Sequence, residues 1–400
     1  VGSGARYPEV NEQINRKMQK GVLIINYNGH GGELGLANEQ ILDVPMINAW
    51  SNINNMPLFV TATCEFSRFD DPARASAGEL ALLNPNGGAI ALLTTVRLVY
   101  QWPNRQLNRA LYDNNVFEPI NGEMPRLGDV FRKTKNGAPS LNSRNFTLLG
   151  DPAVRLNYPK HTIVTTEING VAISGTNPSD TLGALSQVTI KGQVEDENGN
   201  KLSSFNGIVY PTVFDKRSNL STLGNDPTSI KKSFSLYKNI IYKGKANVKD
   251  GEFEFSFIVP QDISYVKGNG KISYYATNSN TDAHGYYDSL IVTGTDKKAP
   301  LDITGPTIRL FMNDTTFRFG GVTNESPSLV ALVSDLHGIN TTGSGIGRDL
   351  TAILDDNRGN VMILNDYYQA KLDSYQEGEI IYPLSKLSEG KHSLKVKVWD

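Results

Sequence analysis

Three continuously apolar segments limit how the first part of this chain can fold. They cover residues 21–27, 57–63 and 89–95, and segments with helical periodicity separate them. Strands that are apolar on both faces are typical of a parallel sheet, because the connecting helices cover both faces. We therefore expect residues 1–158 to form an α/β domain around a parallel sheet. The expected helices cover residues 9–20, 44–51, 104–114 and 126–135, and a further helix begins at 71–72 and stops before the turn at 84–88.

The pattern changes after residue 158. Short alternating segments separated by turns fill residues 161–292, a polar joint follows at 295–300, and strand-like segments continue to residue 400. Alternation of this kind is typical of antiparallel sheets with one buried face. We expect an Ig-like β-sandwich over 159–296 and a second, incomplete β-sandwich-like domain over 297–400. The expected strands are 186–194, 207–215, 247–259, 270–276, 307–312, 329–335, 349–355 and 392–399, with hairpin turns at 267–271 and 343–348.

Charge and composition exclude several classes of function. The formal net charge is −2, only 20% of the residues are charged, and runs of Lys and Arg are absent, so nothing favours nucleic acid as a partner. No apolar stretch approaches the length of a membrane-spanning helix. Four of the five histidines are scattered without metal-ligand spacing, namely His161, His284, His337 and His392. We therefore expect neither a metal nor another cofactor. Because the chain starts at Val1 and stops inside a strand-like pattern, we expect it to be part of a longer protein.

A histidine and the only cysteine each follow one of the apolar segments. His30 comes after the first and Cys64 after the second, where the carboxyl ends of parallel strands would bring them to the same edge of the sheet. Cysteine catalysis needs a thiolate and a group that accepts and returns a proton, and histidine titrates in the right range. Taken singly, a lone cysteine is more often a small buried hydrophobe, and a histidine among glycines is more often an exposed turn residue. Together, their positions favour a shared catalytic site.

Four neighbouring residues are further candidates. The backbone N–H groups of Gly31 and Cys64 could stabilise a tetrahedral oxyanion. Tyr100 and Trp102, in the loop 96–106 after the third strand, could form a wall of a substrate pocket, although packing of a long loop explains them equally well. Glu65 could join a local network of ion pairs or bind a basic substrate group, and the alternative is a solvated charged loop.

Four motifs together resemble the gingipain-like C25 family of cysteine peptidases, which has a caspase-like fold. They are NGHGG at 28–32, TATCEFSRFDD at 61–71, GGAIA at 87–91 and LLGDPA at 148–153. The string CEFSRFD is similar to the sortase branch of the family, which serves type IX secretion. Segments of the third part are similar to the same branch, at 332–340, 345–349, 365–368 and 390–400.

The resemblance implies that Cys64 is the nucleophile and His30 the general acid and base. It implies an acidic residue upstream that orients the histidine, but residues 1–29 contain no clear match. It further implies a surface protein of the outer membrane of a Gram-negative, Bacteroidetes-type bacterium. That protein would remove the C-terminal sorting domain of secreted cargo and attach the cargo to an amine of lipopolysaccharide, next to other surface proteins of the secretion system.

Two other functions stay open. A secreted gingipain-like protease would hydrolyse Arg or Lys bonds, and it should carry an acidic residue in the substrate pocket, which is not evident in 96–106. An adhesin-like surface scaffold would carry an inactive peptidase domain, and the presence of both His30 and Cys64 argues against it.

Overall fold

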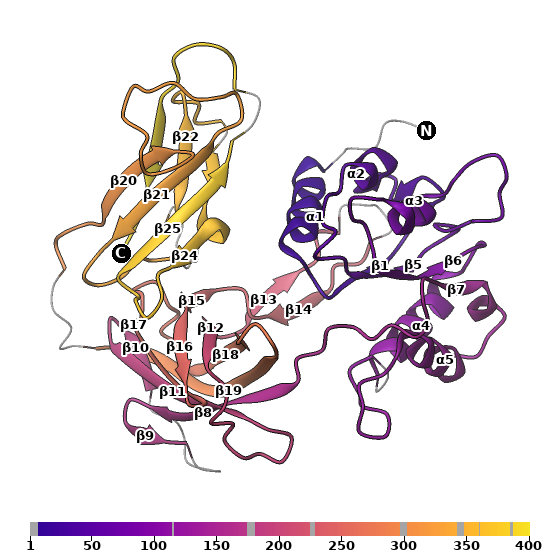
Figure 1. The fold of residues 1–400 in the computed structure, drawn as a ribbon, viewed down its shortest axis with the longest axis horizontal. Helices are drawn as coiled ribbons and strands as arrows, with labels where there is room; N and C mark the ends of the chain where they lie inside the picture. The colour runs from indigo at the N-terminus through magenta and orange to yellow at the C-terminus, as the bar shows by residue number, and fades with distance from the viewer. Residues whose placement is uncertain are drawn as a thin grey trace. The chain divides into compact units, whose positions relative to one another are not determined.

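The computed structural model divides the chain into two compact units, Val1–Tyr158 and Pro159–Asp400 (Figure 1). The structure describes residues 7–113, 116–173, 181–224, 229–296, 302–341, 348–359, 361–384 and 387–400.

The first unit is built on a sheet with the strand order β1-β5-β6-β7. The strands β1 (Ile24–Asn28), β5 (Leu58–Ala62) and β6 (Ala91–Thr95) run parallel, as expected. β7 (Phe146–Leu149), which the sequence did not predict, pairs antiparallel with β6. Every residue of β5 and β6 is buried, which explains why these segments are apolar without alternation.

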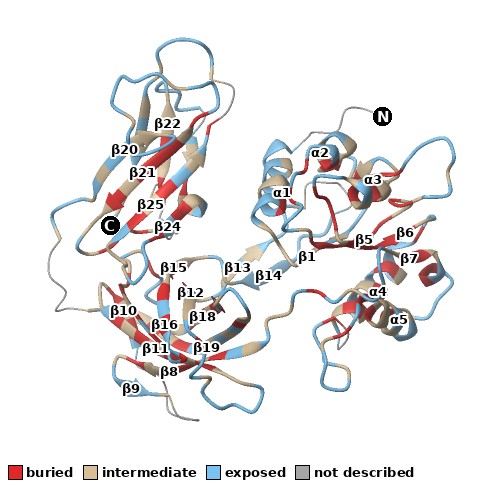
Figure 2. Ribbon diagram, in the orientation of Figure 1, coloured by how far each residue is buried: buried red, intermediate tan, exposed pale blue. Residues whose placement is uncertain are grey.

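Helices cover both faces of this sheet (Figure 1). On one face, Met18, Ile47 and Ala81 pack in a core with Phe59 of β5. On the other face, Leu111 and other helical residues pack in a second core with β5 and β6. Figure 2 shows the buried residues running along the central strands and the inner sides of the helices. The helices are α1 (Pro8–Lys20), α2 (Val44–Asn48), α3 (Ala77–Leu83), α4 (Gln101–Tyr112), α5 (Leu127–Gly137) and the 3₁₀ turn η1 (Asn142–Asn145).

Two helix starts differ from the expectation. α3 begins at Ala77 and not at residues 71–72, because Ser76 and Glu79 form a capping box in which the Ser76 N–H donates to Glu79 Oε2 over 2.7 Å. α4 begins at Gln101, three residues earlier than expected, and this shortens the preceding loop to residues 96–100.

The larger sheet of the second unit closes on itself. Its strand order is β10-β19-β18-β12-β16-β17-β11-β8-β9, and β19 also pairs with β8 in parallel, with Ala283 opposite His161. The expected Ig-like sandwich over 159–296 is therefore wrong, since one barrel-like sheet surrounds a single core. The strands are β8 (His161–Ile168), β9 (Val171–Ala172), β10 (Thr181–Ala184), β11 (Gln187–Glu195), β12 (Gly207–Phe214), β15 (Ile240–Lys243), β16 (Ala246–Lys249), β17 (Glu252–Ile258), β18 (Gly268–Thr277) and β19 (Asp282–Thr295), with a separate ribbon β13 (Ser218–Ser221) and β14 (Ser233–Leu236).

Two local expectations in this sheet are also wrong. The segment 247–259 is two strands, because Asp250 and Gly251 both have positive φ and form a tight turn between them. The expected turn at 267–271 lies within β18, where Gly268 and Gly270 pair with β19.

The remaining strands form two sheets that share a core. One has the order β20-β21-β25-β24 and the other β23-β22-β26, and Leu329 of the first and Ala352 of the second belong to the same buried cluster. This arrangement is a two-layer sandwich. The expected boundary at residue 297 stays a prediction, and residues 343–347 of the expected hairpin turn lie outside the described residues. The elements are β20 (Thr307–Met312), β21 (Ser328–Ser334), β22 (Thr351–Leu354), β23 (Val361–Ile363), η2 (Asn365–Tyr367), β24 (Tyr368–Ala370), β25 (Glu377–Pro383) and β26 (Leu394–Lys397).

Among the described residues, no helix is both long and apolar enough to cross a bilayer.

Candidate active site

His30 and Cys64 follow neighbouring parallel strands at equivalent positions. β1 and β5 pair in register with Asn28 opposite Ala62, and each candidate residue comes two positions later. His30 is exposed and Cys64 is half-buried. Parallel strands that end side by side deliver both residues to one edge of the sheet. We call the segments that carry them the histidine loop, residues 29–34, and the cysteine loop, residues 63–75.

The chain reverses sharply directly after Cys64. Glu65 has a φ of 48°, in the left-handed region that non-glycine residues seldom adopt. The reversal brings Ser67 back to β6, where its N–H donates to the Thr95 carbonyl over 3.0 Å. The Cys64 thiol donates to the Val99 carbonyl over 3.5 Å and packs against the cluster that contains Val99. The cysteine therefore lies at the end of β5, beside the loop that follows β6.

Buried hydroxyl groups fix the end of β5. The Thr61 hydroxyl donates to Thr94 Oγ1 over 2.7 Å, and Ser67 Oγ lies 2.8 Å from the same atom. The Thr95 hydroxyl donates to the Thr63 carbonyl. Since these hydroxyl-bearing side chains are fully buried, their hydrogen bonds are not in competition with water.

The histidine loop lies directly against the residue that precedes Cys64. A Cβ added to Gly31 would lie 2.7 Å from Thr63 Oγ1 and 3.1 Å from the Gly35 carbonyl oxygen. The carbonyl of His30 accepts hydrogen bonds from the Ala37 N–H, at 2.8 Å, and from the Tyr27 hydroxyl, at 2.6 Å. Only a glycine fits at position 31, because the two loops are in contact there. The short strand β2 (Gly31–Gly32) lies within the histidine loop, and the short strands β3 (Gly35–Leu36) and β4 (Leu42–Asp43) follow it.

Neither of the two backbone donors predicted for an oxyanion is used in a strand ladder. The Ala37 N–H bonds to the His30 carbonyl, and Gly31 is paired with Leu36. Because hydrogen-bonded and non-bonded pairs alternate in an antiparallel ladder, the Gly31 N–H points away from β3. The Cys64 N–H has no hydrogen-bond partner among the described residues.

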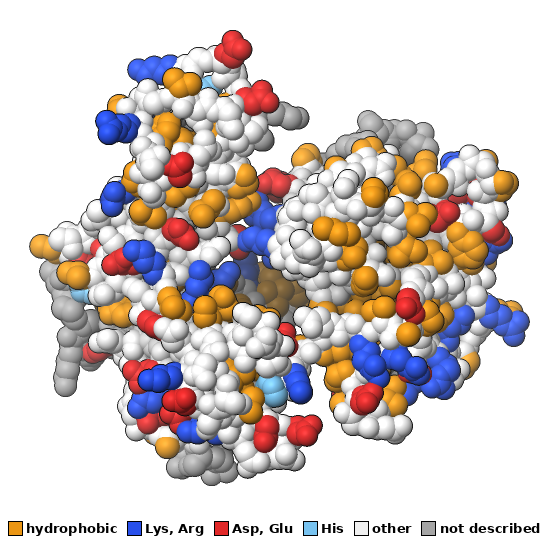
Figure 3. Space-filling view, viewed as in Figure 1, with side chains coloured by type: hydrophobic (Ala, Val, Ile, Leu, Met, Phe, Trp, Pro, Cys, Tyr) orange, Lys and Arg blue, Asp and Glu red, His pale blue; other side chains and the backbone are white. Residues whose placement is uncertain are grey.

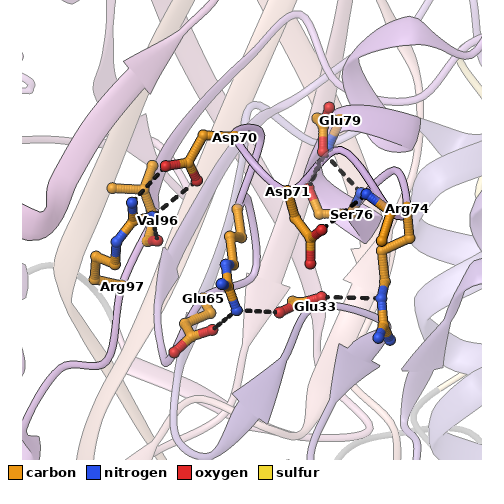
Figure 4. Close-up of polar contacts among 11 residues, drawn as sticks. Glu33, Glu65, Asp70, Asp71, Arg74, Ser76, Glu79, Val96 and Arg97 are labelled. Atoms are coloured by element: carbon orange, nitrogen blue, oxygen red, sulfur yellow. Dashed lines mark hydrogen bonds and ion pairs between the residues drawn. The ribbon is translucent and has the colours of Figure 1, made fainter.

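Ion pairs connect the histidine loop to the cysteine loop (Figure 4). Glu33 Oε1 lies 2.9 Å from Arg68 Nη1, and its Oε2 lies 3.3 Å from Arg74 Nε. Arg68 Nη1 also lies 3.3 Å from Glu65 Oε2. The hydrogen bond with Glu33 raises the pKa of Arg68. The expected ion-pair network at Glu65 therefore exists, and the Glu65 carboxylate is paired with Arg68.

A further ion pair connects the cysteine loop to the loop after β6. Arg97 Nη1 lies 2.8 Å from Asp70 Oδ1, and Nη2 bonds to the second carboxylate oxygen (Figure 4). This bidentate bond holds the pKa of the Asp70 carboxyl below its usual value. Three loops at one edge of the sheet are thus joined by charged side chains.

The candidate pocket residues lie on the surface beside the cysteine. Tyr100 is the N-terminal cap residue of α4, and Trp102 lies in the first turn. Their side chains are 76% and 64% exposed, and Leu98 is 66% exposed. The intervening Val99 carries the carbonyl that accepts from the Cys64 thiol, so the segment with these three side chains passes beside Cys64. Figure 3 shows hydrophobic side chains exposed on the face of the first unit that is in view.

The orienting acid stays unassigned. Within the described part of the chain, the His30 ring makes no hydrogen bond and no ion pair. The sequence interpretation also missed Glu33 and Asn104, the latter a buried residue whose Nδ2 donates to the Ala62 carbonyl over 3.2 Å. The available signals were an acid three residues after His30 with Arg68 in the cysteine loop, and a polar residue on the buried face of a helix.

A thiol and an imidazole placed after neighbouring parallel strands define the class of the first unit as an α/β domain of the cysteine-peptidase type. The model of peptidase family C25 matches residues 1–157. The first unit of the chain belongs to this family. None of the curated proteins is significantly similar to the chain.

Several solved structures are similar to the chain. One is dimeric latent PorU from Porphyromonas gingivalis, with 34% identity, a TM-score of 0.40 and coverage of 79% of this chain. The chain spans only 30% of the length of PorU. Another is the complex of the RgpB pro- and mature domains from Porphyromonas gingivalis, with 13% identity, a TM-score of 0.34 and coverage of 70% of this chain and 57% of that one. The Arg-specific cysteine proteinase gingipain R matches with 13% identity, a TM-score of 0.33 and coverage of 70% and 56%.

Proposed function

We propose that this protein is a cysteine peptidase in which Cys64 is the nucleophile and His30 the general acid and base. The observation that carries the proposal is the in-register pairing of β1 and β5, because both residues follow the carboxyl ends of these strands at the same edge of the sheet. The match of residues 1–157 to peptidase family C25 supports it. Exposure of His30 and partial exposure of Cys64 suit a site that receives a protein chain.

The reaction proceeds through an acyl-enzyme. The Cys64 thiolate attacks the scissile carbonyl, and the N–H groups of Gly31 and Cys64 donate to the oxyanion that forms. Protonated His30 gives its proton to the departing amine, the C–N bond breaks, and a thioester to Cys64 remains. A second nucleophile then loses a proton to His30, attacks the thioester and releases the thiolate.

We further propose that the second nucleophile is an amine, as in the PorU-type sortase branch that the motifs resemble. The substrates are then secreted proteins with a C-terminal sorting domain, and the acceptor is an amine of lipopolysaccharide at the outer face of the outer membrane. The exposed side chains of Leu98, Tyr100 and Trp102 give the substrate an apolar surface beside the thiol. Glu65 is already paired with Arg68, which argues against its use as the acid that selects a basic residue.

The nucleophile is tested by labelling with a peptidyl acyloxymethyl ketone. Because Cys64 is the only cysteine, the full-length protein should gain one adduct on this part of its chain, and Cys64→Ala should gain none there. His30→Ala should lower the cleavage rate by at least about 100-fold. The control is His284→Ala, which replaces an exposed histidine of β19 and should cleave normally. Full cleavage activity in Cys64→Ala would contradict the proposal.

The acceptor is tested with full-length protein and cargo that carries its sorting domain. Cleavage is followed by mass spectrometry, with and without lipopolysaccharide. A product conjugated to an amine supports the sortase function. Cargo that is trimmed and only hydrolysed would show the alternative, a secreted protease, and a preference for Arg or Lys would identify the gingipain-like kind. If the protein neither cleaved cargo nor reacted with the label, the remaining alternative would be a surface scaffold with an inactive peptidase domain.

A further inference from the structure

A histidine and two aspartates converge in the second unit, far along the chain from His30 and Cys64. Asp302 precedes β20, while Asp335 and His337 follow β21. One potential ligand atom from each lies within 4.8 Å of the other two. The sequence hides this group, because Asp302 is more than thirty positions from the other two residues.

Two atoms of the group face each other without a hydrogen bond. His337 Nδ1 and Asp302 Oδ2 are 2.7 Å apart, both atoms are buried, and neither has a hydrogen-bond partner. The contact is close enough for a hydrogen bond but lacks its geometry. An imidazole nitrogen and a carboxylate oxygen in this arrangement are better placed to bind one cation together than to share a proton.

A second histidine–aspartate pair in the same sandwich shows the ordinary arrangement. His392 Nδ1 lies 2.7 Å from Asp355 Oδ2 in hydrogen-bond geometry, and its Nε2 bonds to the Ser388 carbonyl over 2.8 Å. These two contacts raise the pKa of His392, the Ser388 carbonyl most. The pair His337–Asp302, at the same distance, has no such geometry.

Negative charge gathers around His337. The side chain of Asp335 is only 5% exposed, and its Oδ1 accepts the His337 N–H over 2.7 Å and lies 3.9 Å from Nδ1. Asp400 hydrogen-bonds to Asp302 and lines the same cavity as Asp302 and His337. Carboxylates so close to one another need a proton or a cation between them.

The arginine that lines the same cavity is already paired. Arg348 lines the same cavity of about 370 Å³ as Asp302, His337 and Asp400, but its Nη1 lies 2.9 Å from Asp262 Oδ1. The Asp262 side chain is 8% exposed, so the carboxylate of this ion pair is largely shielded from water. In the described part of the chain, neither Asp302 nor Asp335 forms an ion pair with a lysine or an arginine, and His337 is their shared neighbour.

We propose that Asp302, Asp335 and His337 bind a divalent cation that accepts mixed nitrogen and oxygen ligands, of which Zn²⁺ is the probe. One imidazole with carboxylates suits Zn²⁺ better than Ca²⁺ or Mg²⁺, which take oxygen ligands. Ligand atoms of a tetrahedral zinc site lie roughly 3.3 Å apart. His337 Nδ1 lies 2.7 Å from Asp302 Oδ2 and 3.9 Å from Asp335 Oδ1, so small side-chain rotations bring both distances to that value. Asp400 or a water molecule fills the remaining position. The ion would fasten the segment before β20 to the turn after β21.

The site is tested by calorimetric titration of metal-free, tag-free full chain with ZnCl₂. One equivalent should bind, and His337→Ala and Asp335→Asn should each weaken binding at least about 10-fold, because each removes one of three ligands. The matched control is His392→Ala, which should bind as tightly as the unaltered chain. Circular dichroism verifies folding, and His337→Gln replaces His337→Ala if the latter does not fold.

A second readout separates binding from loss of structure. Zn²⁺ should raise the unfolding temperature of the unaltered chain and of His392→Ala but not of His337→Ala, because a ligand that binds only the folded state stabilises it. Absence of saturable Zn²⁺ binding, equal binding in His337→Ala, or tighter binding of Ca²⁺ than of Zn²⁺ would each overturn the proposal.

Discussion

Gly31 of the histidine loop lies directly against Thr63, the residue that precedes Cys64. A side chain at this position would lie 2.7 Å from the branched side chain of Thr63, which is itself fully buried. Thr63 has little freedom to turn away, because a β-branched side chain has few accessible χ1 rotamers and this one is fully buried. We predict that Gly31→Ala displaces the histidine loop, costs about 1–3 kcal/mol of unfolding free energy and lowers the cleavage rate at least about 10-fold. Urea denaturation and cleavage kinetics measure the two effects.

Gly32 provides the matched control. A Cβ added there would meet nothing within 4 Å, so Gly32→Ala should change stability by less than about 0.5 kcal/mol. Adding Thr63→Ala to Gly31→Ala should restore part of the lost stability, since it removes the colliding methyl and hydroxyl groups. Equal effects of the two alanine substitutions would show that the contact at Gly31 does not fix the loop.

The residues of the site were partly predictable from the sequence. The positions of His30 and Cys64 after apolar strands indicated a common edge, and the in-register pairing of β1 and β5 agrees with that. Their catalytic roles stay a prediction. The left-handed conformation of Glu65 and the contact at Gly31 could not be predicted, because both depend on how separate loops meet in space.

Arg68 joins two elements that the sequence keeps apart. It reaches Glu33 of the histidine loop and Glu65, which follows Cys64 directly. We predict that Arg68→Met lowers the cleavage rate about 10-fold, because loops that drift by even 1 Å lose much of their catalytic alignment. Fold stability should change little, since the guanidinium is solvent-exposed.

Arg68→Lys should recover only part of the rate, because an ammonium group does not reproduce the planar fork of arginine. The control is Arg109→Met on α4, whose exposed ion pair with Asp113 lies outside the three loops. If Arg68→Met and Arg109→Met cleave at the same rate, the ion pairs do not position the site.

Asn104 attaches α4 to the end of β5. Its Nδ2 donates to the Ala62 carbonyl, and its Oδ1 accepts from Asn142 Nδ2 over 3.0 Å. We predict that Asn104→Ala destabilises the protein by about 1–3 kcal/mol, because both partners are left buried without a hydrogen bond. Gln106→Ala, at an exposed position of the same helix, should be neutral. Equal unfolding midpoints of the two variants would contradict this.

At the scale of the elements, periodicity predicted the type of most helices and strands better than their ends. α1 and β20 agree closely with the expectation, since apolar spacing and turn residues mark them locally. The start of α3 was wrong because the capping box of Ser76 and Glu79 outcompetes the earlier proline signal. β7 was missed, since its four residues carry no alternation and its place beside β6 is set by tertiary pairing.

At the scale of the whole chain, the change from α/β to β structure at residue 158 was visible in the pattern, and the topology of the β part was not. A sandwich and a closed sheet show the same alternation of buried and exposed residues. The difference is the pairing of β8 with β19, whose partners His161 and Ala283 are far apart in the sequence. Local patterns contain no information on which strands at such separations pair.

The closed sheet surrounds the largest buried cluster of the second unit among the described residues. Phe257 is 1% exposed and stacks on Tyr242, with ring centroids 4.7 Å apart and planes at 6°. Phe257→Ala should cost about 3–5 kcal/mol of unfolding free energy, because the ring of surrounding strands cannot collapse into the cavity. Phe234→Ala, in the separate ribbon of β13 and β14 where the ring is 44% exposed, should cost little. Both are measured by urea denaturation of the full chain with tyrosine fluorescence. Unfolding free energies within about 1 kcal/mol of each other would mean that the closed sheet repacks readily, against the rigidity expected of a close-packed core.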